Sequence, residues 1–145
     1  MPEAVLIDPI FLSTLPQREL RSGYAEVLKH GLIRDLAFFS SLPSTQWEKQ
    51  DWARVIRHSV DIKKAVVEID PKETGVRKIL NFGHSIGHAV ESFYLQSQVP
   101  LLHGEAIALG MIAEGFLSFQ KIGLSFEELK ELGSKLLTIF GKVNL

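Results

Sequence analysis

The sequence predicts an all-α protein, a multi-helix bundle with a short extended segment at its N-terminus. Hydrophobic residues recur at helical spacing along most of the chain, most clearly between Trp52 and Val66. Only one short apolar run, residues 4–7, has the character of a strand or extended arm, and Asp8-Pro9 ends it. Because 145 residues suffice to bury one hydrophobic core, we expect residues 1–145 to form a single helical domain.

The first half of the chain contains three expected helices. One begins at about Gln17 and turns its leucine and valine side chains to one face. Asp35 caps a short second helix, which a proline stops. A long amphipathic helix should open at Ser44 or Thr45 and run to about Ile69, where an Asp-Pro pair ends it.

The second half contains three more. The stretch from Arg77 to Glu91 is expected to be one helix, buried because it is apolar almost all round. A loop leads from it to a very apolar helix that starts at His103 and ends at a glycine. Ser125 caps the last helix, and Glu128, three residues later, completes a capping box.

Composition narrows the class of protein. The formal net charge is -1 and no stretch concentrates lysine and arginine, so nucleic acid is not an expected partner. No apolar run has the length of a membrane span and no signal-peptide pattern opens the chain, which makes the cytoplasm the expected compartment. With no cysteine, His, Asp and Glu remain as metal ligands. A dinucleotide-binding fingerprint and a G-x-S-x-G nucleophile motif are both absent.

Four polar residues would share one stripe of the helix expected over residues 77–91. Arg77, Asn81, His84 and His88 are spaced by four, three and four residues, and such positions are neighbours on a helix surface. An unpaired buried polar group costs roughly 1–3 kcal/mol, so a metal or an anionic ligand is expected to satisfy them. Two histidines at i and i+4 favour a metal site, but the spacing leaves open whether both bind the ion.

Other polar residues and two glycines have simpler interpretations. By spacing alone, Glu26 and Lys29 would form a surface ion pair worth about 0.2–0.5 kcal/mol. Lys63 lies beside the apolar face of the third helix, where it could reach an internal cavity or be a solvated lysine. Gly83 and Gly87 cost helix propensity, which indicates that something approaches their helix closely.

The segment that holds these histidines resembles 3-dehydroquinate synthase. Residues 80–91, LNFGHSIGHAVE, are similar to the signature of that family. Three further segments match in the same order: residues 14–19 (TLPQRE), 23–29 (GYAEVLK) and 102–106 (LHGEA). The resemblance extends from about Asp8 to Gly123, and four motifs in order make a chance match very improbable.

The resemblance implies a fold, a reaction and a metal site. The fold would be the C-terminal helical domain of a dehydroquinate synthase-like protein. The reaction would be that of a metal- and NAD-dependent carbon–oxygen lyase of the shikimate pathway, which serves chorismate and aromatic amino acid biosynthesis. It converts 3-deoxy-D-arabino-heptulosonate 7-phosphate to 3-dehydroquinate and phosphate. A divalent metal, zinc or cobalt, would be held by Glu26, His84 and His103.

The resemblance also implies substrate contacts and a proton-transfer residue. His88 would lie next to the metal, without binding it, and would assist proton transfer; Lys29 would also take part in catalysis. Lys64 is adjacent to one of the matched lysines, Lys63, so the choice between them stays open. The positions that match substrate-binding residues of the family are Lys29, Lys63, Arg77, Asn81 and His88.

Family members also carry an N-terminal α/β domain that binds NAD and a further C-terminal segment, neither of which these residues match. We therefore expect an excised metal- and substrate-binding domain, without a cofactor-binding residue for NAD, that does not turn over substrate. The whole enzyme is expected to be a homodimer that acts on a small sugar-acid phosphate. One alternative is a related sugar-phosphate cyclase; another is a non-catalytic helical interaction module whose metal has a closed shell of four ligands.

Overall fold

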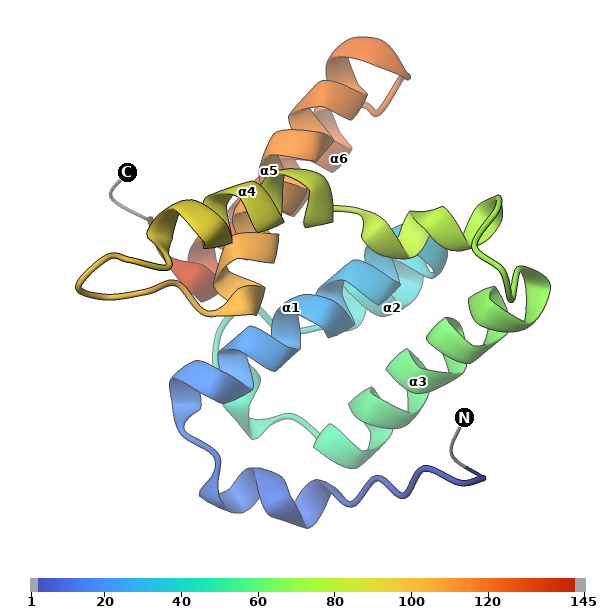
Figure 1. The fold of residues 1–145 in the computed structure, drawn as a ribbon, viewed down its shortest axis with the longest axis vertical. Coiled ribbons are helices and arrows are strands. Elements are labelled where there is room, and N and C mark those ends of the chain that lie inside the picture. The colour runs from blue at the N-terminus through green and yellow to red at the C-terminus, as the bar shows by residue number, and fades with distance from the viewer. Residues whose placement is uncertain (1–2, 143–145) are drawn as a thin grey trace.

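The computed structural model describes residues 3–142, and all the regular secondary structure in that range is helical, with no strand (Figure 1). The all-α prediction is confirmed; the outermost residues of the expected domain, 1–2 and 143–145, lie outside the described range. The α-helices are α1 (Gln17–Arg34), α2 (Leu36–Ser41), α3 (Trp52–Ile69), α4 (His84–Tyr94), α5 (His103–Lys121) and α6 (Phe126–Phe140). The described residues also form three short 3-10 helices: Pro9–Thr14 before α1, Trp47–Lys49 between α2 and α3, and Val76–Asn81 between α3 and α4.

The start of α3 differs from the prediction. The helix begins at Trp52, not at Ser44 or Thr45, and the Asp51 side chain caps it by accepting the Arg54 N–H at 3.1 Å. The residues before it turn inward through Gln46, whose φ is 51°. This turn buries Trp47, whose ring stacks on Tyr24 at 5.5 Å, so packing in the core overrides the helical pattern there.

The stretch from Arg77 to Glu91 is two helices, not one. A 3-10 helix ends at Asn81, and Gly83, with a φ of 80°, breaks the chain direction before α4 starts at His84. The carboxylate of Glu114 in α5 accepts the N–H groups of Gly83 at 2.7 Å and Ile86 at 3.2 Å, which stabilises the new N-terminus. The expected burial is also wrong, because Gly87 is the only buried residue of α4.

Helix α5 lies close against Gly83 and Gly87. A Cβ atom at Gly110 of α5 would lie 1.9 Å from the carbonyl oxygen of Gly83, and one at Gly87 would lie 2.8 Å from Ile107. A Cβ at Gly104 would lie 2.0 Å from the carbonyl oxygen of Ser22 in α1. The prediction of a close approach is therefore confirmed, and these contacts fix the N-terminal ends of α4 and α5 beside α1.

The core lies between α1, α5 and α6, and its most deeply buried large side chains include Tyr24, Leu28, Ile107, Met111 and Leu136. Helices α5 and α6 form a hairpin at the end of the molecule opposite the N-terminal segment (Figure 1). The capping box predicted at the start of α6 is present. Among residues 3–142, no helix combines the length and the hydropathy needed to cross a lipid bilayer.

Candidate metal centre

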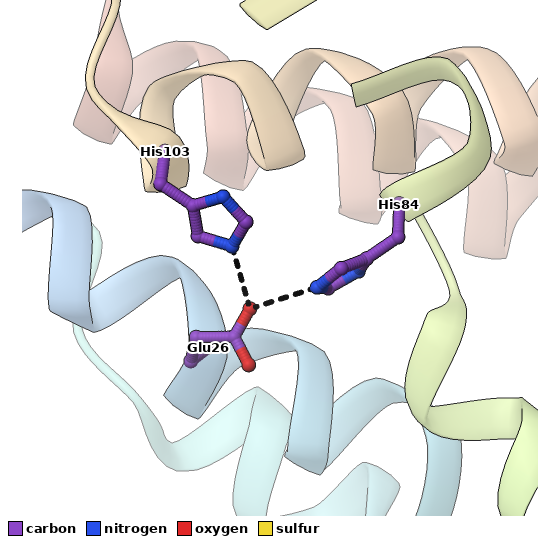
Figure 2. Close-up of side chains that lie close together, drawn as sticks. All are labelled: Glu26, His84 and His103. Atoms are coloured by element: carbon purple, nitrogen blue, oxygen red, sulfur yellow. Dashed lines mark ion pairs between the residues drawn. The ribbon is translucent and has the colours of Figure 1, made fainter. Parts of the chain in front are cut away.

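Three side chains from three helices meet at one point (Figure 2). Glu26 comes from the middle of α1, while His84 and His103 are the first residues of α4 and α5. Oε1 of Glu26 lies 3.6 Å from Nε2 of His84 and 3.9 Å from Nε2 of His103. One potential ligand atom from each residue lies within 4.8 Å of the other two. The fold thus brings Glu26 next to two histidines that follow it in the sequence by 58 and 77 positions.

The chemistry of these three groups fits a divalent metal. Oε1 of Glu26 is buried and has no hydrogen-bond partner among the described residues, which is costly for a charged oxygen unless a cation meets it. Its separations from the two histidine nitrogens are too long for hydrogen bonds. Ligands about 2.0–2.2 Å from a tetrahedral ion lie roughly 3.3–3.6 Å apart, close to this spacing.

The histidines are held in the tautomer that a metal ligand needs. Nδ1 of His84 lies 3.2 Å from the carbonyl oxygen of Phe82, and Nδ1 of His103 lies 3.2 Å from a carboxylate oxygen of Glu91. Both partners can only accept, so each Nδ1 carries a proton, and in the neutral imidazole Nε2 then keeps its lone pair for a metal. Burial, and then the charge of Lys29, lower the pKa of His84, which keeps its imidazole neutral.

Lys29 holds the other oxygen of the Glu26 carboxylate. Its Nζ donates to Oε2 at 2.7 Å, and only 2% of Lys29 is exposed, so the surface ion pair expected from spacing alone is wrong. Burial alone would raise the pKa of Glu26, but the hydrogen bond and charge of Lys29 lower it below its ordinary value. Burial lowers the pKa of Lys29, and its bond to Glu26 opposes that shift. The carboxylate is therefore ionised and offers one free oxygen.

A basic cavity of about 190 Å³ lies next to these residues. Lys63 lines it, although the residue as a whole is exposed, whereas Lys64 points to Glu68, with Nζ 3.8 Å from a carboxylate oxygen. His88 is not among the lining residues, but its ring centroid lies 5.2 Å from that of His84. The cavity is lined by Glu26, Lys29, His30, Lys63, Glu73, Arg77, Leu80, Asn81 and His84.

Arg77 and Asn81 reach this cavity from the 3-10 helix despite the break in the expected stripe. Nη1 of Arg77 donates to the carbonyl oxygen of Pro71 at 2.9 Å, and its Nε lies 3.7 Å from Glu73. Nδ2 of Asn81 donates to the other oxygen of Glu73 at 2.8 Å. Glu73 therefore orients both side chains, a contact that the sequence analysis missed.

His30 and Glu91 were missed as well. His30 is buried, its Nδ1 lies 2.7 Å from Oγ of Ser59, and burial together with the charge of Lys29 lowers its pKa to about 4. The available signals were helical spacings: His30 follows Glu26 by four residues, and Glu91 follows His88 by three. These spacings occur throughout any helix, so they become informative only once the neighbouring helices are placed.

One carboxylate and two imidazoles beside a basic cavity in a helical domain define a candidate metal-dependent enzyme domain. Residues 23–142 match the family model described as 3-dehydroquinate synthase C-terminal. The chain belongs to this family. Its all-helical fold and its recognition from the sequence motifs are both confirmed by that match.

Similar proteins support the same family. The chain is 50% identical over 134 residues to a 3-dehydroquinate synthase of Geobacillus kaustophilus, covering 88% of this chain and 36% of that protein. It is 41% identical over 134 residues to a 3-dehydroquinate synthase of Parabacteroides distasonis, covering 90% of this chain and 38% of that protein. The chain thus spans little more than a third of the length of these curated relatives.

A solved structure has a similar fold. The 2-epi-5-epi-valiolone synthase ValA from Streptomyces hygroscopicus subsp. jinggangensis was determined with NAD+ and Zn2+ bound. It aligns with a TM-score of 0.81 and 29% sequence identity, over 97% of this chain and 40% of ValA.

Proposed function

We propose that this chain is the metal- and substrate-binding domain of a 3-dehydroquinate synthase. The observation that carries the proposal is the buried, unpartnered Oε1 of Glu26 between the Nε2 atoms of His84 and His103. Identities of 41–50% to 3-dehydroquinate synthases support the reaction, and the Zn2+ bound to ValA supports zinc over cobalt. The substrate would be 3-deoxy-D-arabino-heptulosonate 7-phosphate, and the products 3-dehydroquinate and phosphate.

In this proposal the metal, when bound, supplies Lewis-acid activation of a substrate hydroxyl. Lys63 and Arg77 receive the phosphate and carboxylate, for which ammonium and guanidinium groups are suitable partners. Asn81 donates to a hydroxyl from its amide, and Lys29 holds the ionised Glu26 while it contacts the substrate. His88 moves a proton through its Nε2, because its Nδ1 is 3.2 Å from the carboxylate of Glu91.

We assign NAD binding to the part of the relatives that lies outside the aligned residues. The 145 residues alone would then bind the substrate without turning it over, because the oxidation step needs NAD. The whole enzyme would act as a homodimer.

Two other functions are less well supported than this one. The likeness to ValA favours another sugar-phosphate cyclase as the second candidate, but its 29% identity is well below the 50% found for a 3-dehydroquinate synthase. A non-catalytic module with a metal staple would need a closed shell of four ligands. The described residues instead bring three ligands together beside a cavity lined by lysine and arginine.

The proposal can be tested by calorimetric titration of the chain with a carbocyclic phosphonate analogue of the substrate. We expect binding that depends on zinc and that Arg77→Ala weakens at least about tenfold, since a charge-assisted contact is lost. Arg57→Ala, on the exposed side of α3, serves as the matched control and should bind like the unaltered chain. Binding that is indifferent to both zinc and Arg77 would refute the assignment of the substrate site.

A further inference from the structure

Glu91 contacts two histidines of the site at once. Its Oε2 lies 3.2 Å from Nδ1 of His88, one turn earlier in α4, and 3.2 Å from Nδ1 of His103, the first residue of α5. The ring centroids of these two histidines are 5.5 Å apart. One carboxylate oxygen thus joins the residue proposed to move a proton to a residue proposed to hold the metal.

We infer that Glu91 is a positioning residue that fixes the tautomer and the ring orientation of both His88 and His103. The inference rests on the metal and proton-transfer roles proposed above. A carboxylate only accepts hydrogen bonds, so the Nδ1 atoms that face it must both carry protons. In the neutral imidazole Nε2 then has a lone pair. That of His103 faces Glu26, and that of His88 can accept a proton.

This arrangement completes a pattern shared by the three imidazoles. The carbonyl oxygen of Phe82 holds Nδ1 of His84 at 3.2 Å, and Glu91 does the same for the other two histidines. His84 is fixed by the backbone of its own turn, whereas His103 depends on a side chain from a different helix. Acceptors of this kind raise the basicity of metal-bound histidine, and their loss typically costs 10–100-fold in metal affinity.

The same atoms could in principle hold a second ion. Ligand atoms of His88, Glu91 and His103 lie within 4.8 Å of one another. Metal binding there would require His103 to lose the proton on Nδ1 while Nε2 serves the first site, so its ring would carry a negative charge. All three side chains are also at least 30% exposed. Two hydrogen bonds to a single ionised oxygen account for the distances without that cost.

The first test measures the tautomers directly in the metal-free chain. Long-range nitrogen–proton correlation spectra at about pH 8, where ordinary histidine is neutral, distinguish a proton on Nδ1 from one on Nε2. We expect His88 and His103 to be Nδ1-protonated in the unaltered chain and to shift toward the Nε2–H tautomer in Glu91→Ala. Nε2–H tautomers in the unaltered chain would overturn the inference, whether or not the chain binds zinc.

The second test measures zinc affinity by competition with a chelator. We expect Glu91→Ala to weaken binding about 10–100-fold, and Glu91→Gln, which keeps an acceptor oxygen and the side-chain shape, to weaken it less. Glu68→Gln is the matched control, because Glu68 is exposed and pairs with Lys64 on the outer side of α3. Unchanged affinity in Glu91→Ala, or two zinc ions per chain with the second lost in Glu91→Gln, would contradict the inference.

Discussion

Glu26 divides its two carboxylate oxygens between different partners, and this division organises the residues of the site. Oε2 accepts from Lys29 at 2.7 Å, while Oε1 faces the two histidine nitrogens and has no hydrogen-bond partner among the described residues. Because Lys29 and Glu26 are partly or wholly buried, neither charge is stable without the other. The pair therefore belongs to the site and not to the surface.

At the same scale, the structure distinguishes the two neighbouring lysines of α3. Lys63 lines the basic cavity, whereas Lys64 pairs with Glu68 at 3.8 Å on the exposed side. We predict that Lys63→Ala weakens binding of the phosphonate analogue about tenfold or more, because a direct phosphate contact is lost. Lys64→Ala should leave it unchanged, since exposed pairs contribute little. Calorimetric titration checks both; an equal effect of the two substitutions would contradict the placement of Lys63.

Residue types and motif positions were sufficient to select the candidate ligands from the sequence. The hydrogen bonds that orient the site residues were less predictable from the sequence. Glu73 acts on Arg77 and Asn81 through a turn whose geometry depends on Gly75 and Asp70, and Asp70 accepts three backbone N–H groups there. Such a network has no simple periodicity, so no spacing in the sequence indicates it.

At the scale of the elements, the contact between α4 and α5 depends on the absence of side chains. A Cβ at Gly110 would lie 1.9 Å from the carbonyl oxygen of Gly83, and backbone cannot move away as a flexible side chain can. We predict that Gly110→Ala destabilises the fold by at least about 2 kcal/mol, in the range of severe overpacking.

Gly133 in α6 provides the matched control. Nothing lies within 4 Å of a Cβ atom at this position, so Gly133→Ala should stabilise the helix by about 0.5–1 kcal/mol. Denaturant unfolding of both variants measures the two effects. Similar stabilities for Gly110→Ala and the unaltered chain would show that α4 and α5 are not in this close contact.

Lys135 joins α6 to the C-terminal end of α2. Its Nζ donates to the carbonyl oxygens of Phe39 at 2.6 Å and Leu42 at 2.9 Å, at the end of the short helix. We predict that Lys135→Ala lowers the free energy of unfolding by about 1–3 kcal/mol. Lys130→Ala, on the exposed side of α6, should change it by less than about 0.5 kcal/mol. Thermal unfolding of the two variants gives the comparison, and equal midpoints would refute the role of Lys135.

The helices themselves were largely predictable, whereas their breaks were not. The caps of α2 and α6, at Asp35 and Ser125, are local signals and were identified correctly. The break at Gly83 depends on Glu114, a residue 31 positions away that caps the new helix. The late start of α3 depends on the packing of Trp47 against Tyr24. Both are tertiary effects that override local helical preference.

At the scale of the whole molecule, carboxylates whose pKa values are lowered in the folded state make folding sensitive to acid. Burial alone would raise the pKa of Glu105, but hydrogen bonds from Arg18, the Leu102 backbone and Arg21 lower it to about 2, against an ordinary value of 4.5. Five further carboxylates also have pKa values below their ordinary values: Glu26, Asp35, Asp70, Glu91 and Glu128.

Proton linkage gives the direction in which the free energy of unfolding changes with pH. A carboxylate with a lowered pKa in the folded state contributes stability above the unfolded pKa and loses it as pH falls toward the folded pKa. We predict that the stability tied to Glu105 is full above about pH 4.5 and falls between about pH 4.5 and 2. Denaturant unfolding across this range should show a shallower decline for Glu105→Gln. Parallel pH profiles for the two proteins would contradict the proposed pairing with Arg18 and Arg21.

The central claim is that Glu26, His84 and His103 hold one divalent metal, and zinc titration with site variants tests it most directly. We predict one zinc ion per chain and a loss of affinity of more than about 100-fold in His84→Ala, His103→Ala and Glu26→Ala, since each removes a ligand. His58→Ala is the matched control, because His58 pairs with Asp35 at 2.8 Å away from the cavity and should not affect binding. Zinc binding that survives all three site substitutions, or that is lost equally in His58→Ala, would contradict the account.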